Sequence, residues 1–249
     1  MAQSIEARNI SFQYDTAAGP VLAVKEASFS VAPAEFLCVL GPSGCGKTTI
    51  LNMLAGFLTP TGGEILMDGN PVTAREHNRG VVFQDFAQLF PWRTARQNVE
   101  FGLEMRGVSR EARRETARQF LKLVKLEKFA DAYPHQLSGG MQQRIAIARA
   151  LAYNPGVLLM DEPFAALDAM TRDEMQKQLT EVWQETRKTI VYITHNVAEA
   201  VYLADQILVM APHPGTIRAR IPLALPRPRD PLSANFVEMQ RQVLANLTH

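Results

Sequence analysis

Short, continuous apolar runs separated by amphipathic stretches dominate the hydrophobic pattern of this chain. Residues 36–40 (FLCVL) form one such run, and a glycine-rich turn and a helical pattern at residues 48–57 follow it directly. Further runs predict strands at residues 157–162, 189–194 and 206–211, with helical patterns between them. Alternating strands and helices are typical of a mostly parallel sheet that helices cover on both faces. The pattern therefore predicts an α/β fold.

The N-terminal part of the chain predicts further strands. Residues 4–12 and 21–31 are strand-like, and residues 17–20 (AAGP) predict the turn between them. Residues 62–69 (GGEILMDG) predict a short strand with glycine at both ends.

Prolines mark the C-terminal part, where six of the 15 lie between residues 212 and 231. Proline lacks the amide hydrogen that a central strand needs. We therefore expect an extended loop with an edge strand at residues 215–223, followed by a short closing helix at residues 233–247.

The middle of the chain is rich in helical patterns. Residues 141–152 (MQQRIAIARALA) place apolar side chains near one stripe of a helix. Residues 104–128 contain eight Arg or Lys residues and four acids, with apolar residues at helical spacing. Two interpretations of this basic stretch stay open: a solvated helical face, or a docking surface for anionic groups or for a partner.

Composition narrows the class of protein. The 249 residues carry a net charge of +1, which excludes a strongly basic domain that holds nucleic acid through bulk charge but not a local basic patch. No apolar run approaches the roughly 20 residues that cross a bilayer, and the first residues lack the apolar core of a secretory signal. The two cysteines, Cys38 and Cys45, argue against a disulfide framework and a structural zinc site. We expect a cytoplasmic protein with reduced thiols.

The strongest chemical signal is the sequence GPSGCGKTT, which fits the phosphate-loop pattern G-x-x-x-x-G-K-[ST] between a strand and a helix. Glycines let the backbone curl so that its N–H groups point into one cavity, and the helix start adds a positive dipole end. Lys47 is expected to reach the β- and γ-phosphates of a nucleotide, and Thr48 to hold Mg²⁺. The nucleotide-binding residues predicted here are Gly41, Pro42, Ser43, Gly44, Cys45, Gly46, Lys47, Thr48 and Thr49.

Two adjacent carboxylates end the apolar run in VLLMDEP, residues 157–163. Acids at the end of a buried strand are costly unless a cation or a polar ligand accepts them. We expect Asp161 to support the Mg²⁺ shell, and Glu162, which strand alternation directs to the other side, to polarise an attacking water. Taken alone, the pair also fits a strand that simply ends at the surface.

The sequence LSGGMQQR, residues 137–144, places Ser138, Gly139 and Gly140 just before a helical pattern. Such a helix start is a second potential anion site. The alternative interpretation is a helix cap with local glycine flexibility.

Together, the phosphate loop, the acidic pair and LSGGMQQR resemble the ATP-binding subunits of ABC transporters over nearly the whole chain. LSGGMQQR is similar to the signature sequence of that superfamily, which other phosphate-loop NTPases lack. The resemblance implies one ABC-type domain over residues 1–249. Its fold would be a RecA-like P-loop NTPase core with an antiparallel β-subdomain and an inserted α-helical subdomain at about residues 86–155.

The same resemblance assigns roles to four further residues. Tyr14 matches the aromatic residue that stacks on adenine, with a tyrosine packed on the core as the plainer alternative. Gln84 matches the glutamine that reaches Mg²⁺ and the attacking water, with a polar loop residue as the alternative. His195 matches the histidine that senses the γ-phosphate, with a structural histidine as the alternative. Asp168 matches the loop that crosses to a partner subunit. The resemblance thus implies catalytic roles for Glu162, His195 and Gln84, and magnesium contacts for Thr48, Gln84 and Asp161.

Assembly also follows from the resemblance. Ser138, Gly139 and Gly140 would contact the γ-phosphate that the other chain holds, so two copies would meet head to tail as a homodimer around two ATP molecules. ATP binding would close the dimer and hydrolysis would open it. Met141 and Ala165 depart from the usual glutamine and glycine of the family, but neither change removes a group assigned to the reaction.

Within the family the chain resembles the ATPases of nitrate, sulfonate and taurine importers, through segments such as LFPWRTARQNVEFGLEMRGV and VMAPHPGTI. This implies a motor that powers uptake of a small anionic solute through a separate membrane permease, at the cytoplasmic face of the cell membrane. A solute-binding protein would be an indirect partner. Phe90 and Trp92 would lie near the permease contact, unless Trp92 packs inside the helical subdomain.

Two other functions stay as alternatives. A soluble ABC ATPase acting on nucleic acid or ribosomes usually has tandem ATPase units or long inserted arms, whereas this chain has one unit and a nearly neutral charge. A small-molecule kinase on the same phosphate loop would leave LSGGMQQR and His195 without a role.

Overall fold

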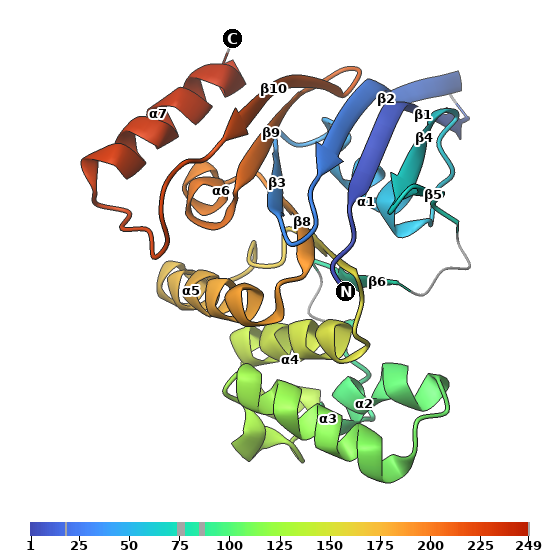
Figure 1. Ribbon diagram of the computed structural model, residues 1–249, viewed down its shortest axis with the longest axis vertical. Helices are drawn as coiled ribbons and strands as arrows, with labels where there is room; N and C mark the ends of the chain where they lie inside the picture. Colours follow the sequence, from blue (N-terminus) through green and yellow to red (C-terminus); the bar gives the residue numbers. More distant parts are fainter. Residues whose placement is uncertain (18, 74–77, 85–87, 249) are drawn as a thin grey trace. The chain divides into compact units, whose positions relative to one another are not determined.

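The computed structural model describes residues 1–17, 19–73, 78–84 and 88–248 (Figure 1). The chain packs into two compact units, of which unit 1 consists of Met1–His77 and Lys188–His249, and unit 2 of Asn78–Arg187. No helix in the described ranges has both the length and the apolar character of a membrane span.

An antiparallel sheet in unit 1 is built from the N-terminal strands. Its order is β2-β1-β4-β5, and β1 pairs with both β2 and β4. Apolar side chains at alternate positions, such as Ile5, Ala7 and Phe29, are buried. The strands are β1 (Ile5–Thr16), β2 (Gly19–Val31), β4 (Gly62–Met67) and β5 (Asn70–Pro71).

A second sheet in unit 1 carries strands from the continuous apolar runs. β3 pairs in parallel with both β8 and β9, and every residue of β3 and β8 is buried. β10 pairs antiparallel with β9 at the edge, as the prolines near it predict. In spatial order the strands are β10 (Thr216–Pro222), β9 (Gln206–Ala211), β3 (Phe36–Leu40) and β8 (Thr189–Thr194).

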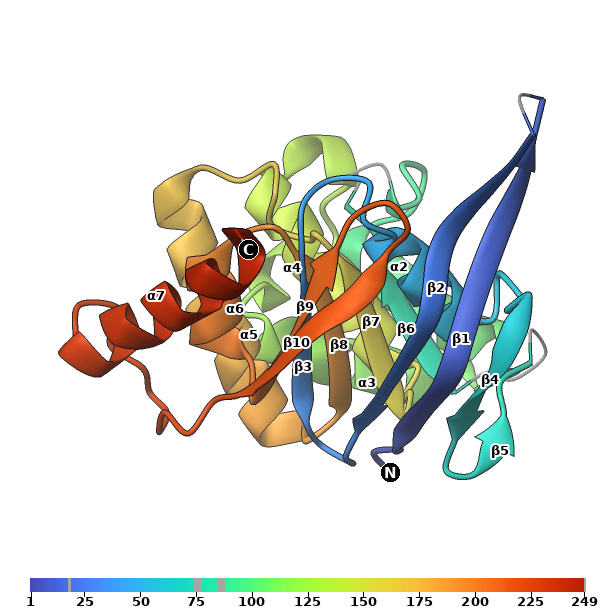
Figure 2. The same ribbon diagram turned by 90° about the horizontal axis from the view of Figure 1, so that it is seen from above.

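Helices cover both faces of this second sheet, which explains why its central strands β3 and β8 are buried along their whole length. Figure 2 shows α1 (Lys47–Ala55) on one side, and α6 (Val197–Leu203) and α7 (Ala234–Thr248) on the other. α1 packs against β8, α6 against β3, and α7 against β9. The side chains of Phe236 and Val243 in α7 are buried.

Unit 2 joins two parallel strands to a group of helices. β6 (Arg79–Val82) pairs in parallel with β7 (Val157–Asp161). Helices α2, α3 and α4 pack against one another, as Figure 1 shows. The helices are α2 (Ala95–Met105), α3 (Arg110–Leu123), α4 (Gly139–Ala152) and α5 (Ala169–Thr186), with 3₁₀ turns at Glu127–Phe129 and Pro134–Gln136.

The strands predicted at residues 36–40, 189–194 and 206–211 are confirmed with the same bounds. The turn predicted at residues 17–20 is wrong on its C-terminal side, because Gly19 pairs with Thr16 and begins β2. The Thr16 hydroxyl donates a hydrogen bond to the Gly19 carbonyl oxygen at 2.7 Å, which closes a tighter hairpin. Ala18 of that turn lies outside the described residues.

The domain bounds stay predictions. The expected helical subdomain, about residues 86–155, contains α2, α3 and α4, whereas unit 2 also includes β6, β7 and α5. Residues 86 and 87 at its edge lie outside the described residues.

A pair of glycines in unit 1 tests the close packing of β4 on β1. Gly63 and Gly69 have similar positive φ angles, +75° and +77°, so alanine is strained at both by about 1 kcal/mol. A Cβ at Gly63 would lie 2.3 Å from the Arg8 carbonyl oxygen, whereas at Gly69 nothing lies within 4 Å. We expect Gly63→Ala to lower the free energy of unfolding by about 1–3 kcal/mol more than Gly69→Ala. Urea denaturation followed by circular dichroism measures both, and equal losses would contradict the packing.

Candidate functional site

The glycine-rich loop of unit 1 follows the buried strand β3 and runs directly into α1. Gly46 caps α1 with φ +87°, and a Cβ there would lie 2.8 Å from the Ala23 carbonyl oxygen. Gly44 also has a positive φ, +77°. These angles let the loop curl around the start of α1, where the first backbone N–H groups have no partner within the helix. The loop therefore has the geometry of a phosphate site.

Lys47 is oriented into this loop although it begins a helix. Its side chain is almost fully buried, and Nζ donates hydrogen bonds to the carbonyl oxygens of Gly41 at 2.8 Å and Pro42 at 2.9 Å. The positive charge is thus held against the curled backbone, beside the helix start. Thr48, the next residue, is exposed.

Tyr14 lies next to the same helix. Its hydroxyl is 3.2 Å from Thr49 Oγ1, and its ring packs edge-on against Phe12 with the centroids 4.8 Å apart. The side chain is 39% exposed, so the contact with Phe12 covers only part of its ring. The ring is accessible beside the glycine loop, and its contact with adenine stays a prediction.

His195 follows β8 at the edge of the sheet where the glycine loop follows β3. Leu40 and Thr194 are partners in the parallel register, so the loop and His195 leave the sheet side by side. The turn is fixed from inside: the buried Thr194 hydroxyl donates to the carboxylate of Glu199 and accepts the backbone N–H of Asn196 at 3.0 Å. His195 itself is exposed.

Gly215 is a structural support of the loop that the sequence analysis missed. Its N–H donates to the Ala23 carbonyl oxygen at 3.0 Å, and its own carbonyl oxygen accepts the N–H of Lys25 at 2.9 Å. A Cβ at Gly215 would lie 2.2 Å from the carbonyl oxygen of Cys45. The only signal in the sequence is its place in VMAPHPGTI, which matches the family pattern.

In unit 2, Gln84, Asp161 and Glu162 come from the corresponding ends of two parallel strands. Val82 of β6 pairs with Met160 of β7, so the residues that follow both strands leave from one edge. Gln84 is exposed, and the two acids are partly buried.

Glu162 corrects the expectation for its strand. β7 ends at Asp161, one residue earlier than predicted, and Glu162 has φ +42°. Strand alternation therefore does not set the direction of its side chain. A non-glycine residue in the left-handed region is strained, and such strain is concentrated at functional sites.

Ser138, Gly139 and Gly140 form the start of α4, as the capping interpretation predicts. Ser138 is exposed, and its hydroxyl accepts the N–H of Met141 at 3.3 Å. Gly140 is buried, and a Cβ there would lie 2.9 Å from Thr171 Cγ2. The cap does not exclude binding of an anion, because other N–H groups of the first turn have no partner within the helix.

Asp168 caps the neighbouring helix α5 in the same way. Its carboxylate accepts the N–H of Thr171 at 3.0 Å, and the hydrogen bond from the Thr171 side chain, followed by that from the backbone, lowers the pKa of Asp168. Because Thr171 also lies next to Gly140, the starts of α4 and α5 lie together.

The expected magnesium contacts suit a metal that is bound together with phosphates. Among the described residues no three His, Cys, Asp or Glu side chains gather as a metal cage. Mg²⁺ in phosphate-transfer sites is held by one or two carboxylates together with phosphate oxygens. The exposed hydroxyl of Thr48 and the carboxylate of Asp161 at its strand end fit that donor set.

The structure thus brings Tyr14, the glycine loop and His195 together within unit 1. Within unit 2 it places Gln84 and the two acids after the same ends of two paired strands, and it brings the helix starts at Ser138–Gly140 and Asp168 together. The roles of these residues stay predictions.

This chain is similar to known proteins of one family. The family model described as ABC transporter matches residues 24–165. The uncharacterized ABC transporter ATP-binding protein MJ0412 of Methanocaldococcus jannaschii is 48% identical over 244 residues, 98% of this chain and 91% of the relative. The taurine import ATP-binding protein TauB of Pseudomonas entomophila is 51% identical over 219 residues, which are 88% of this chain and 83% of the relative. The nitrate import ATP-binding protein NrtD of Synechocystis sp. is 49% identical over 208 residues, which are 84% of this chain and 78% of the relative.

Solved structures agree with the fold. The dimeric structure of MJ0796, a bacterial ABC transporter cassette, has a TM-score of 0.78 and 35% identity, covering 89% of this chain and 99% of that chain. Its post-hydrolysis dimer bound to ADP and Pi has a TM-score of 0.75 and 34% identity, with the same coverage. The predicted P-loop NTPase α/β fold is confirmed.

The support by Gly215 can be tested against Gly62, where a Cβ would make only an ordinary contact of 3.7 Å with Ser11. Gly215→Ala must displace the carbonyl of Cys45 and with it the glycine loop. We expect the dissociation constant for ATP to rise about tenfold, or 1.4 kcal/mol, while Gly62→Ala leaves it unchanged. Isothermal titration calorimetry measures both. Wild-type affinity in Gly215→Ala would contradict the support.

Proposed function

Because the chain belongs to the ABC transporter family, we propose that it is the ATP-binding and hydrolysing motor subunit of an importer. The observation that carries this proposal is the glycine loop, in which Lys47 Nζ is already turned toward the carbonyls of Gly41 and Pro42. A phosphate loop of this kind binds the β- and γ-phosphates of a nucleotide.

We propose that each residue acts on the nucleotide as follows. Lys47 and the loop N–H groups hold the phosphates, while the accessible ring of Tyr14 stacks on adenine. Thr48, Gln84 and Asp161 hold Mg²⁺, which supplies charge neutralisation at the phosphates.

Glu162 accepts a proton from the attacking water, and Gln84 orients that water. His195, exposed where the glycine loop also leaves the sheet, responds to the γ-phosphate.

The proposed assembly is a head-to-tail homodimer that closes on ATP and opens after hydrolysis. Ser138 and Asp168 are exposed at the adjoining starts of α4 and α5, and Met170 beside them is 85% exposed. Methionine is enriched at protein interfaces, so Met170 suits this place. In this dimer Ser138, Gly139 and Gly140 contact the γ-phosphate bound by the other copy.

The proposed cargo is a small anionic solute resembling nitrate, a sulfonate or taurine, because TauB and NrtD are named for taurine and nitrate import. A separate permease would carry the solute, and a solute-binding protein would deliver it. Trp92 is 71% exposed and its ring lies tilted against that of Phe90, with ring centroids 5.6 Å apart. It therefore does not pack inside unit 2 and is free to anchor a permease. The chain would then lie at the cytoplasmic face of the cell membrane.

The other functions have less support. None of the relatives named above supports a soluble ABC ATPase that acts on nucleic acid or ribosomes. A kinase would need an acceptor, so turnover of ATP by the purified chain without any acceptor separates it from the proposed function. Co-purification with a membrane permease tests the importer assignment.

Glu162→Gln tests the reaction. The amide keeps the size of the side chain but cannot take a proton, so we expect ATP turnover to fall about 100-fold or more while ATP still binds. Phosphate release measures turnover, and calorimetry measures binding. Glu185→Gln, an exposed glutamate on α5, is the matched control and should keep wild-type turnover. Normal turnover in Glu162→Gln would refute the assignment.

The shared site is tested by size-exclusion chromatography of Glu162→Gln with ATP, which should elute as a dimer. Adding Ser138→Arg should return it to a monomer, because bulk and charge then stand at the partner's phosphate. Ser109→Arg is the control, since Ser109 caps α3 as Ser138 caps α4 and its loss costs a similar amount, about 1 kcal/mol. A dimer that persists with Ser138→Arg contradicts the head-to-tail arrangement.

A further inference from the structure

Helix α3 carries a row of four cations on one face: Arg110, Arg114, Arg118 and Lys122. Residues four apart lie above one another on a helix, so the row extends about 18 Å along α3. All four side chains are exposed. Like charges at this spacing destabilise a helix by about 0.2–0.5 kcal/mol per pair, so the row does not serve the stability of α3.

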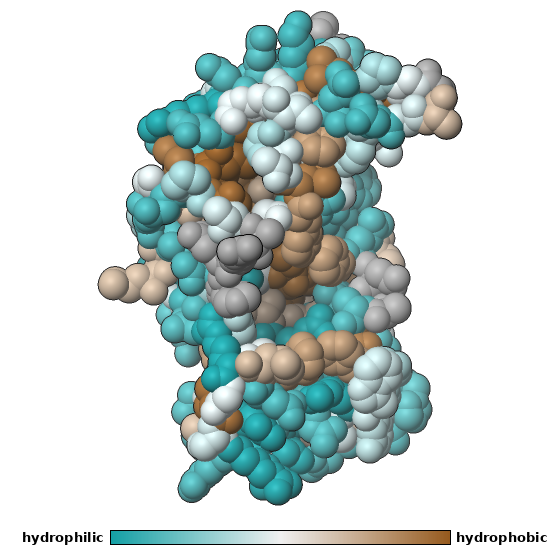
Figure 3. Space-filling model, turned by 90° about the vertical axis from the view of Figure 1, so that its right-hand side faces the viewer, coloured by the Kyte–Doolittle hydropathy of each residue, from teal (hydrophilic) through white to brown (hydrophobic). Residues whose placement is uncertain are grey.

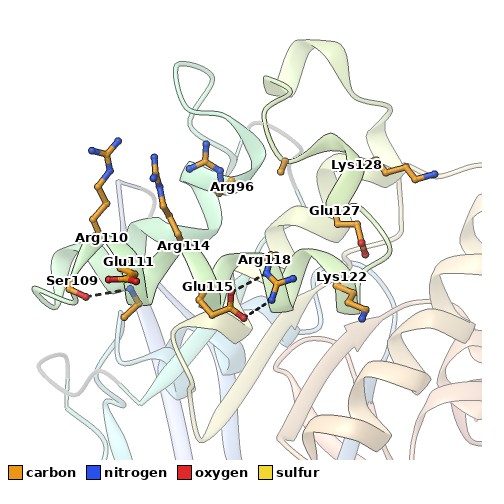
Figure 4. Close-up of a pocket in the computed structure, with 12 residues that line it drawn as sticks. Arg96, Ser109, Arg110, Glu111, Arg114, Glu115, Arg118, Lys122, Glu127 and Lys128 are labelled. Carbon is orange, nitrogen blue, oxygen red and sulfur yellow. Dashed lines mark hydrogen bonds and ion pairs between the residues drawn. The ribbon is translucent and has the colours of Figure 1, made fainter.

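The row lines an open groove of about 1290 Å³ within unit 2 (Figure 4). Arg96 of α2 and Lys128 of the first 3₁₀ turn line the same groove. Figure 4 shows Arg96, Arg110 and Arg114 extending in a common direction, away from the ribbon of α3. The lower part of Figure 3, where α2 and α3 lie, is likewise mostly hydrophilic on the face shown.

Several of these cations lack an acid of their own. Among the described residues no ion pair or hydrogen bond engages the side chains of Arg110, Arg114, Lys122 or Lys128. By contrast, Arg118 pairs with Glu115 at 2.8 Å, and Arg96 pairs with Asp131 at 2.7 Å.

On the buried side of α2 and α3, by contrast, an arginine has acids close by. Arg113, also on α3 but partly buried, lies 3.5 Å from the nearly buried carboxylate of Glu100 and 3.8 Å from that of Glu104. The absence of such partners is therefore confined to the groove face of the helix.

The groove also concentrates charge. Six cations and three acids line it, an excess of three positive charges where the whole chain has an excess of one. The acids are Glu111, Glu115 and Glu127, all exposed. A local excess of this size attracts an anionic partner in a salt-dependent way.

We propose that this groove binds an acidic α-helical segment of a partner protein. Carboxylates repeated every four residues on a second helix have the same spacing as the row on α3, so they can meet Arg110, Arg114 and Lys122, which have no acid partner among the described residues. The groove is concave and long enough for about three turns of such a helix. Arginine suits this contact because its planar group binds carboxylates with two parallel hydrogen bonds.

Other anionic partners fit less well. A bilayer is flat, and the described part of the groove lining includes no large apolar side chain that could insert into it. A single-stranded nucleic acid would need aromatic platforms, and the described residues that line the groove include none. The inference goes beyond the proposed function, since no residue of the glycine loop lines the groove.

The test is binding of a labelled, alanine-rich peptide of about 20 residues with glutamate at every fourth position, followed by fluorescence anisotropy at low ionic strength. A peptide of the same composition with the glutamates spread around the helix is the control probe. The protein is the full chain, as wild type and as Arg110→Glu/Arg114→Glu. Both side chains are exposed and neither has an ion-pair partner among the described residues, so folding is retained.

Lys177→Glu/Arg241→Glu is the matched protein control, since both are exposed and lie outside the groove while the net charge changes equally. We expect the spaced peptide to bind wild type and this control alike, and the groove variant about tenfold more weakly. Intrinsic ATP turnover should be the same in all three proteins.

Three results would overturn the proposal: no binding of the spaced peptide, equal binding of both peptides, or equal binding by the groove variant. Binding of phosphatidylglycerol vesicles or single-stranded DNA through the groove without binding of the peptide would also overturn it, in favour of that ligand. Absence of ATP turnover by the wild-type chain would refute the proposed function but would not bear on peptide binding at the groove.

Discussion

The phosphate loop lies where backbone segments approach so closely that no side chain fits between them. A Cβ at Gly41 would meet the Met210 carbonyl oxygen at 2.9 Å, one at Gly46 the Ala23 carbonyl oxygen at 2.8 Å, and one at Gly215 the Cys45 carbonyl oxygen at 2.2 Å. Two distant parts of the chain, one around Ala23 and one at residues 210–215, thus hold the loop by close backbone packing. Everything attributed to the loop depends on this contact, because a displaced loop cannot direct its N–H groups to one point.

Unit 2 uses hydrogen bonds where unit 1 uses close packing. Ser138 and Asp168 each cap a helix, and Thr171 contacts both helix starts, so the segment that would face a partner is held by its own polar groups. On α2 and α3 of the same unit, charged side chains differ in their partners. Arg113 lies close to the carboxylates of Glu100 and Glu104, whereas Arg110 and Arg114 have no acid partner among the described residues. Polar satisfaction therefore distinguishes the surfaces that stabilise the unit from those available to others.

Continuous apolar runs predicted β3, β8 and β9 to the residue, because two-sided burial leaves no other pattern for a short strand. The motifs likewise located the candidate site residues along the chain. The left-handed backbone of Glu162 was not predictable, since it results from tertiary context rather than from a turn residue. Nor was the support by Gly215, which lies far from Cys45 in sequence. Charge counts predicted a basic stretch, but only the structure distinguishes its paired cations from the unpaired ones.

The side chain of Lys47 has a thermodynamic consequence for nucleotide capture. A lysine on the surface samples many rotamers and loses that freedom when it grips a ligand, at a cost of about 0.5–1.5 kcal/mol. Here two carbonyl oxygens already fix the ammonium before any phosphate arrives. The rotamer entropy of the Lys47 side chain is lost during folding. The triphosphate therefore binds a charge that is already fixed, and more of the interaction energy contributes to affinity.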